Sequence, residues 1–259
     1  MTGLARQVTL LAATVLTLVM NYLSNALPLF GNSNAEVSNR LPNAFTPAGL
    51  TFAVWGPIFL GLLVFAVYQA LPAQRGARLD RLFWPFLLGN LLNVAWLLAF
   101  QSLNIGLSVV IMLALLAVLV RLYLSVRSLP PQGAERWTLQ LPVSLYLAWI
   151  SVATIANITA FLVSAGVTQS FLGIAGPVWS ALLLVVAAAI GVFFLWRFRD
   201  YAFAAVLLWA FYGVYVARPE VSTVVLGVAV AAGLVLLGSL SAWRRPRGPA
   251  RRAGRLWSR

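Results

Sequence analysis

The side chains of this chain that could bind a ligand are tryptophans and asparagines within apolar segments. Asn93, Trp96 and Phe100 are spaced i, i+3, i+7, and Trp149 and Asn157 are spaced i, i+8, so each set shares one face of a helix. An amide in apolar surroundings must find a partner. Asn93 and Asn157 therefore face protein, water or a ligand, and interhelical packing remains the alternative to a pocket.

Other chemistry is scarce. The 259 residues include five carboxylates and no histidine or cysteine, so imidazole catalysis, thiolate chemistry and the usual side-chain ligands of zinc and haem iron are absent. No carboxylate lies within an apolar segment, where ion-coupled pumps generally need one. We expect no enzymatic activity, no metal site and no required cofactor. Four carboxylates precede or begin a predicted helix, where they face the positive end of its dipole: Asp80, Glu135, Asp200 and Glu220.

The elements that must position these residues are membrane-spanning helices. The composition is 62% hydrophobic and 9% charged, too apolar for a water-soluble protein of this length. Crossing a hydrocarbon layer of ~30 Å needs about 20 apolar residues. The sequence therefore predicts an all-α, polytopic bundle of about eight transmembrane helices, at 7–29, 49–70, 82–100, 105–126, 138–162, 173–195, 201–217 and 222–243.

The arginines predict the orientation of the bundle. All 18 basic residues are arginine, and sixteen of them fall on one side of the predicted spans, with only Arg40 and Arg218 on the other. Basic loops are retained in the cytoplasm, so we expect both termini inside. The arginines lie at helix ends and in the tail, which predicts contact with a lipid bilayer and no nucleic-acid partner. The tail, 244–259, is rich in Arg, Pro and Gly and is expected to be disordered.

The outer connection 31–48 is the longest and could cover a site. Given the predicted directions of the spans, Trp55, Asn93, Trp96, Phe100 and Asn157 lie in the outer half of the membrane, with Trp149 near mid-depth. The six residues are therefore expected to line one cavity beneath this connection. Ser24-Asn25-Ala26 has the form of a signal-peptidase site, but apolar residues continue beyond it, so we expect the first span to be retained.

Three segments carry a family resemblance. Leu92-Asn93-x-x-Trp96-x-x-x-Phe100, Trp149-x-Ser151-x-Ala153-Thr154-x-x-Asn157 and the Phe45–Gly56 segment, with Thr46-Pro47 and Trp55, resemble the TspO/MBR family of tryptophan-rich sensory proteins. The stretch from Asn25 through Trp55 is similar to its long bacterial branch, which has extra C-terminal helices. The resemblance covers about residues 1–163.

The resemblance implies a function and a division of the chain. It implies a TspO/MBR-like five-helix bundle over 1–163, three additional transmembrane helices over 164–243 and the basic tail. It also implies a pocket for a porphyrin, a haem-like tetrapyrrole or another hydrophobic small molecule, a sensory role in the inner membrane of a bacterium, and a homodimer. A transporter of small amphipathic or porphyrin-like molecules is the alternative. Ala187-x-x-x-Gly191 and Ala229-x-x-x-Gly233 permit close helix contacts within the chain or between protomers.

Overall fold

The protein is an all-α bundle, as predicted. The computed structural model describes residues 3–27, 29–168 and 170–246. The α-helices are α1 (Gly3–Ala26), α2 (Asn34–Arg40), α3 (Trp55–Ala70), α4 (Phe83–Gln101), α5 (Ile105–Arg127), α6 (Leu141–Ser164), α7 (Gly176–Phe198), α8 (Tyr201–Ala217) and α9 (Ser222–Arg244). Shorter turns are η1 (Gly49–Val54), η2 (Pro72–Gln74), η3 (Ala77–Leu82) and the π-helical η4 (Arg136–Gln140), and β1 (Ser170–Phe171) pairs with β2 (Ile174–Ala175).

The predicted spans correspond to apolar helices. Seven helical segments in the described part of the chain are long and apolar enough to cross a membrane: Gly3–Ala26, Gly49–Ala70, Ala77–Gln101, Ile105–Arg127, Arg136–Ser164, Gly176–Phe198 and Ser222–Arg244. The eighth predicted span is α8, which has 17 residues. At a rise of about 1.5 Å per residue, this is about the shortest helix that crosses the hydrocarbon layer. Trp84, Trp137, Trp196 and Trp243, near the helix ends, are all 49% or more exposed, as expected of side chains at a membrane interface.

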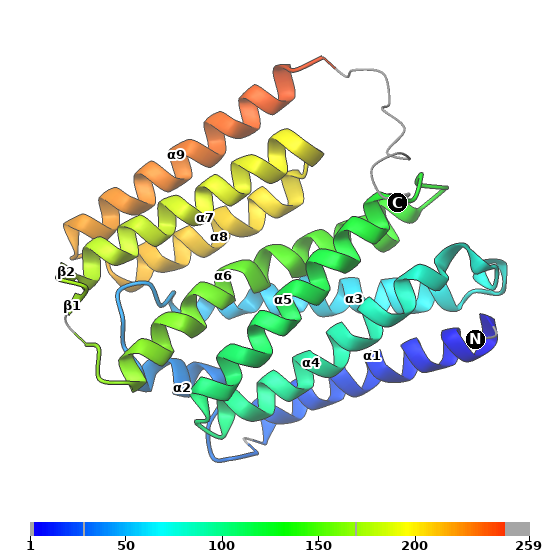
Figure 1. The fold of residues 1–259 in the computed structure, drawn as a ribbon, viewed down its shortest axis with the longest axis horizontal. Coiled ribbons are helices and arrows are strands. Elements are labelled where there is room, and N and C mark those ends of the chain that lie inside the picture. The colour runs from blue at the N-terminus through cyan, green and yellow to red at the C-terminus, as the bar shows by residue number, and fades with distance from the viewer. Residues whose placement is uncertain (1–2, 28, 169, 247–259) are drawn as a thin grey trace.

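Two groups of helices make up the bundle (Figure 1). In the first, α1 packs on α3 and α4, α4 on α5, α5 on α6, and α6 on α3, which closes a ring of five helices. In the second, α7, α8 and α9 pack on one another, and α8 also packs on α6 and on η1. Because α8 contacts both α6 and η1, the second group of helices packs against the segment that leads into α3.

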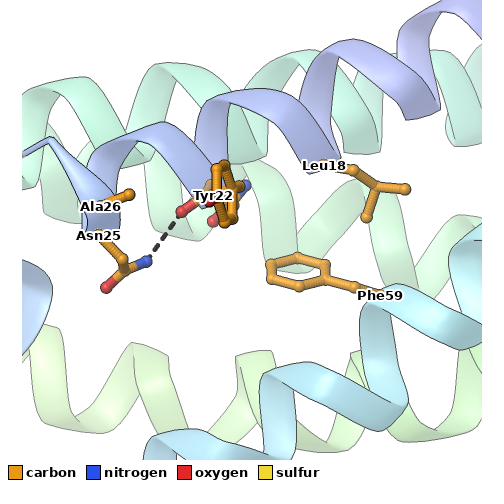
Figure 2. A pocket seen from close by; sticks show the side chains of 6 residues that line it. Leu18, Tyr22, Asn25, Ala26 and Phe59 are labelled. Carbon is orange, nitrogen blue, oxygen red and sulfur yellow. Dashed lines mark hydrogen bonds between the residues drawn. The ribbon is translucent and has the colours of Figure 1, made fainter.

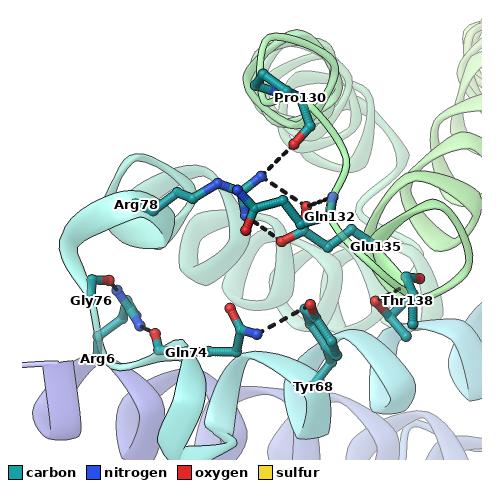
Figure 3. A network of polar contacts seen from close by, with 10 residues as sticks. Arg6, Tyr68, Gln74, Gly76, Arg78, Pro130, Gln132, Glu135 and Thr138 are labelled. Atoms are coloured by element: carbon teal, nitrogen blue, oxygen red, sulfur yellow. Dashed lines mark hydrogen bonds and ion pairs between the residues drawn. The ribbon is translucent and has the colours of Figure 1, made fainter.

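Ion pairs join five segments at one end of the bundle. Arg6 in α1 pairs with Asp80 in η3. Arg78 in η3 pairs with Glu135 before η4 (Figure 3). Arg127 at the end of α5 pairs with Asp200 between α7 and α8, at 2.6 Å. The N-terminal helix and the connections predicted to share one side of the membrane thus meet at one end of the fold.

Two connections differ from expectation. The segment 31–48 contains the helix α2, which begins with a capping box in which Ser33 and Glu36 each accept a backbone N–H of the other. The sixth span was predicted to begin at 173, but α7 begins at Gly176. The residues before it form the β1–β2 hairpin, because Leu172 and Gly173 both have positive φ, as a tight two-residue turn requires. Of the tail expected to be disordered, 247–259 lies outside the described residues.

The small residues of the last helices have two different surroundings. A Cβ on Gly191 would meet Leu207 of α8 and Val235 of α9, so the Ala187–Gly191 face packs within the chain. A Cβ on Gly233 would have no neighbour within 4 Å, so the Gly233 face of α9 is open. The homodimer stays a prediction.

Candidate functional site

The start of α3 is held in place by α8. The backbone N–H of Ala48 donates to the carbonyl of Gly213 at 2.9 Å, and the indole N–H of Trp209 donates to the carbonyl of Thr51 at 2.9 Å. Gly213 has no side chain, which leaves room for Thr51 to lie directly against α8. These contacts fix η1, and η1 in turn places Phe52 and Trp55 against Tyr146 and Trp149 of α6.

Trp55 and Trp149 belong to one aromatic cluster between α3 and α6. The Trp55 ring stacks on Phe59 with centroids 5.0 Å apart, and it meets Tyr146 and Trp149 edge-on at 6.1 Å and 6.3 Å. Phe52 meets Trp149 edge-on at 6.0 Å from the other side. Edge-to-face and offset pairs at these separations are favourable beyond the area they bury. The cluster is therefore a preorganised wall of flat rings.

Buried hydrogen-bond donors without acceptors lie beside these rings. The indole N–H of Trp149 and the Tyr146 hydroxyl in α6 make no hydrogen bond, and neither does Nδ2 of Asn93 in α4. The Tyr146 hydroxyl lies next to the Asn93 amide, without the geometry of a hydrogen bond. The carbonyl oxygen of Asn93 is satisfied, because it accepts from Asn21 of α1 at 2.8 Å. Buried polar groups are nearly always paired, so these three donors are exceptions with unused hydrogen-bonding capacity.

Trp96, Phe100 and Asn157 form a second, fully hydrogen-bonded cluster. The Trp96 indole N–H donates to Oδ1 of Asn157 at 2.8 Å, and the Asn157 amide donates to the Ser108 hydroxyl at 2.9 Å. Phe100 stacks on Trp96 with centroids 5.2 Å apart. These contacts link α4, α5 and α6, so on this face the amide acts as an interhelical contact.

A cavity of about 470 Å³ opens between α1 and α3, next to the first cluster. Its lining residues are Leu18, Asn21, Tyr22, Asn25, Ala26 and Phe59. Figure 2 shows Phe59 extending from α3 toward α1, between Leu18 and Tyr22. None of the six predicted residues is in this lining, but two of them are one contact away, because Asn21 binds Asn93 and Phe59 stacks on Trp55.

Comparison with known proteins identifies the family. The chain matches the TSPO-like protein family over residues 7–241. It belongs to the TSPO-like family. The match continues beyond residue 163, where the resemblance of the sequence was expected to end, and includes α7 and α8. No curated protein matches the chain, and no solved structure matches it.

Several residues of the cluster in this TSPO-like protein were missed from the sequence. Tyr146 lies three residues before Trp149 and Phe59 lies four residues after Trp55, so helical spacing from each predicted tryptophan would have found them. Asn21 is an amide within the first span. The argument applied to Asn93, that such an amide must face protein or a ligand, predicts its inward orientation as well.

The carboxylates have structural roles. Asp200 caps α8 by accepting the backbone N–H of Phe203 at 3.1 Å, as predicted. Asp80 lies in the first turn of η3 and Glu135 directly precedes η4, as predicted, and both side chains form ion pairs there. Burial opposes ionisation of Glu135, but hydrogen bonds from Arg78 and from the backbone N–H of Gln132 outweigh it, so its pKa is lowered. Glu220 does not cap α9, because Val221 occupies the N-cap position. The described residues include no group of three metal-ligating side chains.

Proposed function

We propose that this integral membrane protein of the TSPO-like family binds a flat, largely apolar ligand, such as a metal-free porphyrin. The binding region would comprise the first cluster, with Trp55, Trp149 and the neighbouring Asn93, and the adjoining cavity between α1 and α3. Trp96, Phe100 and Asn157 would hold α4, α5 and α6 together next to it. The observation that carries the proposal is the set of three buried donors without acceptors, on Trp149, Tyr146 and Asn93, beside a wall of aromatic rings.

The chemistry of these groups suits a tetrapyrrole. Stacked and edge-on rings offer broad apolar contact to a planar molecule, and a cavity of about 470 Å³ is within the ordinary range for ligand sites. Carboxylate or carbonyl oxygens on the ligand would accept from the three free donors. With no histidine or cysteine in the chain, affinity would come from these contacts and not from the usual axial ligation of iron.

The test is a titration of the purified protein with protoporphyrin IX, followed by quenching of tryptophan fluorescence. Tyr146→Phe removes a hydroxyl that makes no hydrogen bond in the unliganded protein, so the melting temperature should not fall. If that hydroxyl donates to the ligand, affinity should fall about fivefold, since one hydrogen bond contributes on the order of 1 kcal/mol. If the Tyr146 side chain served only packing, Tyr146→Phe would not lower the affinity for the porphyrin while leaving the melting temperature unchanged.

Trp149→Phe and Trp243→Phe form the matched pair for location. Trp149 is 3% exposed within the first cluster, and Trp243 is 77% exposed at the far end of α9. Trp149→Phe should lose a disproportionate share of the quenching and weaken binding, whereas Trp243→Phe should do neither. Equal quenching and equal affinity in the two variants would place the ligand elsewhere.

We further propose a sensory role in the inner membrane of a bacterium, with both termini cytoplasmic. The arginine distribution supports this orientation, and the ion pairs gather the arginine-rich connections at one end. Reporter fusions after Ala77 and Gln132 should read inside, and a fusion within 31–48 should read outside. A C-terminal fusion that reads outside would contradict the orientation. Accumulation of porphyrin in proteoliposomes would favour transport over sensing.

A further inference from the structure

A second cavity lies between the two groups of helices, on a different face of α6 from the aromatic clusters. Its volume is about 680 Å³, and its walls come from the outer part of α6, the start of α7, the β1–β2 hairpin, residues 42–44 and the connection between α8 and α9. The α6 side chains that line it include Ile155, Ile158 and Leu162, whereas Asn157 on the same helix bonds to α4 and α5. The cavity is thus separate from the porphyrin site proposed above.

Most of the cavity wall is apolar. Ile158 and Leu162 of α6 and Pro177 and Leu183 of α7 line it. Trp179 also lines it, and its indole N–H donates to the Phe171 carbonyl at 2.7 Å. Branched aliphatic side chains and a fixed indole suit a flexible hydrocarbon chain. They include no free donor of the kind that distinguishes the first cluster.

Positive charge gathers at the polar side of this cavity. Arg218 lines it, and its guanidinium donates only to backbone carbonyls, those of Ala217 at 2.7 Å and Asn43 at 3.1 Å. Across the described residues, the ion pairs involve Arg6, Arg78 and Arg127, so Arg218 has no carboxylate partner there. Glu220, two residues further on, is exposed and is not part of the lining.

The first turn of α7 adds partial positive charge to the same cavity. Gly176 and Pro177 of that turn line the cavity, and the N-cap Ala175 supplies no side-chain acceptor to the N–H groups at the start of the helix. The N-terminus of a helix carries partial positive charge and favours anions. Arg218 and the α7 terminus therefore meet at one cavity whose remaining walls are apolar.

We infer that this cavity binds an amphiphile with one anionic headgroup and a hydrocarbon chain, with the anion at Arg218 and the chain between α6 and α7. The chemistry is that of a fatty-acid carboxylate or an anionic membrane lipid. A guanidinium donates paired hydrogen bonds to a carboxylate or phosphate, and the backbone carbonyls now bound to Arg218 leave its charge unneutralised.

The experiment uses the full-length protein in a neutral detergent and a fatty acid brominated along its chain, which quenches a nearby indole. The wild-type protein is compared with Trp179→Phe, so that the signal from the cavity is the difference between them. The fatty acid should bind at least tenfold more tightly than its uncharged methyl ester. A brominated phosphatidylglycerol tests the membrane lipid as the source of the anion, and the tighter of the two ligands identifies it.

Arg218→Gln and Arg40→Gln are the matched variants, because these are the two arginines on the predicted outer side. Arg218→Gln should weaken the fatty acid roughly tenfold or more, as expected for a charge-assisted hydrogen bond, and leave the methyl ester unchanged. Arg218→Lys should recover part of the affinity, and Arg40→Gln should have no effect. Leu183→Trp fills the cavity and should abolish binding of both ligands.

Two results would overturn the inference. One is equal affinity for the acid and the ester in the wild-type protein, and the other is equal affinity in Arg218→Gln and Arg40→Gln. Arg218 also donates a hydrogen bond to the Asn43 carbonyl, so the melting temperature of each variant is recorded. Arg218→Lys keeps the positive charge, so it separates the loss of charge from the loss of this contact. Porphyrin quenching in the same variants should stay as in the wild type, so the two sites are tested independently.

Discussion

Gly213→Ala should destabilise the protein because α8 and η1 touch at this glycine. A Cβ on Gly213 would lie 2.8 Å from Cγ2 and 2.9 Å from Cβ of Thr51, and closer still to its hydroxyl oxygen. Carbon atoms in good contact are about 3.5–4.0 Å apart. The new methyl group must therefore push η1 away from α8, against the hydrogen bonds that Gly213 and Trp209 make to it.

The magnitude follows from two opposing effects. Overpacking of this kind costs about 1–3 kcal/mol, whereas Gly to Ala within a helix gains about 0.5–1 kcal/mol from backbone entropy. We expect a net loss of up to about 2.5 kcal/mol in the free energy of unfolding, measured by denaturation of the purified protein in mild detergent. The displacement of Phe52 from Trp149 should also shift tryptophan emission.

Gly233→Ala is the control. It lies within α9, where a Cβ meets nothing within 4 Å, so only the entropic gain remains and stability should stay equal or rise. Thr51→Ala removes the clashing hydroxyl and methyl groups, and that hydroxyl makes no hydrogen bond. The double variant Thr51→Ala/Gly213→Ala should therefore be more stable than the sum of the single effects predicts. If Gly213→Ala and Gly233→Ala behave alike, the described contact between α8 and η1 is wrong.

Two further predictions concern the ion pairs. Asp200→Ala should lower the free energy of unfolding by about 3 kcal/mol or more, because it leaves Arg127 without its ion-pair partner. It also removes the acceptor of the Tyr123 hydroxyl, at 2.8 Å, and of the Ser144 hydroxyl, at 2.6 Å. Adding Tyr123→Phe to this variant should recover part of the lost stability in denaturation measurements. Glu135→Gln should lower stability at neutral pH, but the difference from wild type should shrink as the pH falls below 4.5, because a lowered carboxyl pKa stabilises the folded state only while Glu135 is ionised. A difference that stays constant down to pH 3 would show that Glu135 contributes no charge interaction.

The spans could be predicted because a hydrocarbon layer dictates the length of each apolar run. The helix α2 could not be found by that criterion, since it is short and carries no apolar run. Its Ser33 and Glu36 pair is a local signal that a search for capping boxes would have detected. The hairpin before α7 was missed for a similar reason, because Leu172 gives no sign of its positive φ.

The candidate site could be predicted only in part. Helical spacing correctly placed Trp96 and Phe100 on one face, and the need to satisfy a buried amide correctly turned Asn93 and Asn157 inward. Spacing along one helix cannot say which neighbouring helix a face meets. The pairing of Asn93 with Asn21, and of Trp55 with Tyr146, depends on how α1, α3, α4 and α6 are rotated against each other, and single-sequence patterns carry no such signal.

The last three helices bear on the site through two contacts. Asp200 at the start of α8 accepts hydrogen bonds from Tyr123 and Arg127 of α5 and from Ser144 of α6, so it fixes one end of α8 against the five-helix ring. Near the other end of α8, Gly213 holds η1, which carries Phe52 against Trp149. Both contacts belong to one helix of 17 residues. The placement of Phe52 beside Trp149 therefore depends on α8 as well as on α3 and α6, which carry the cluster.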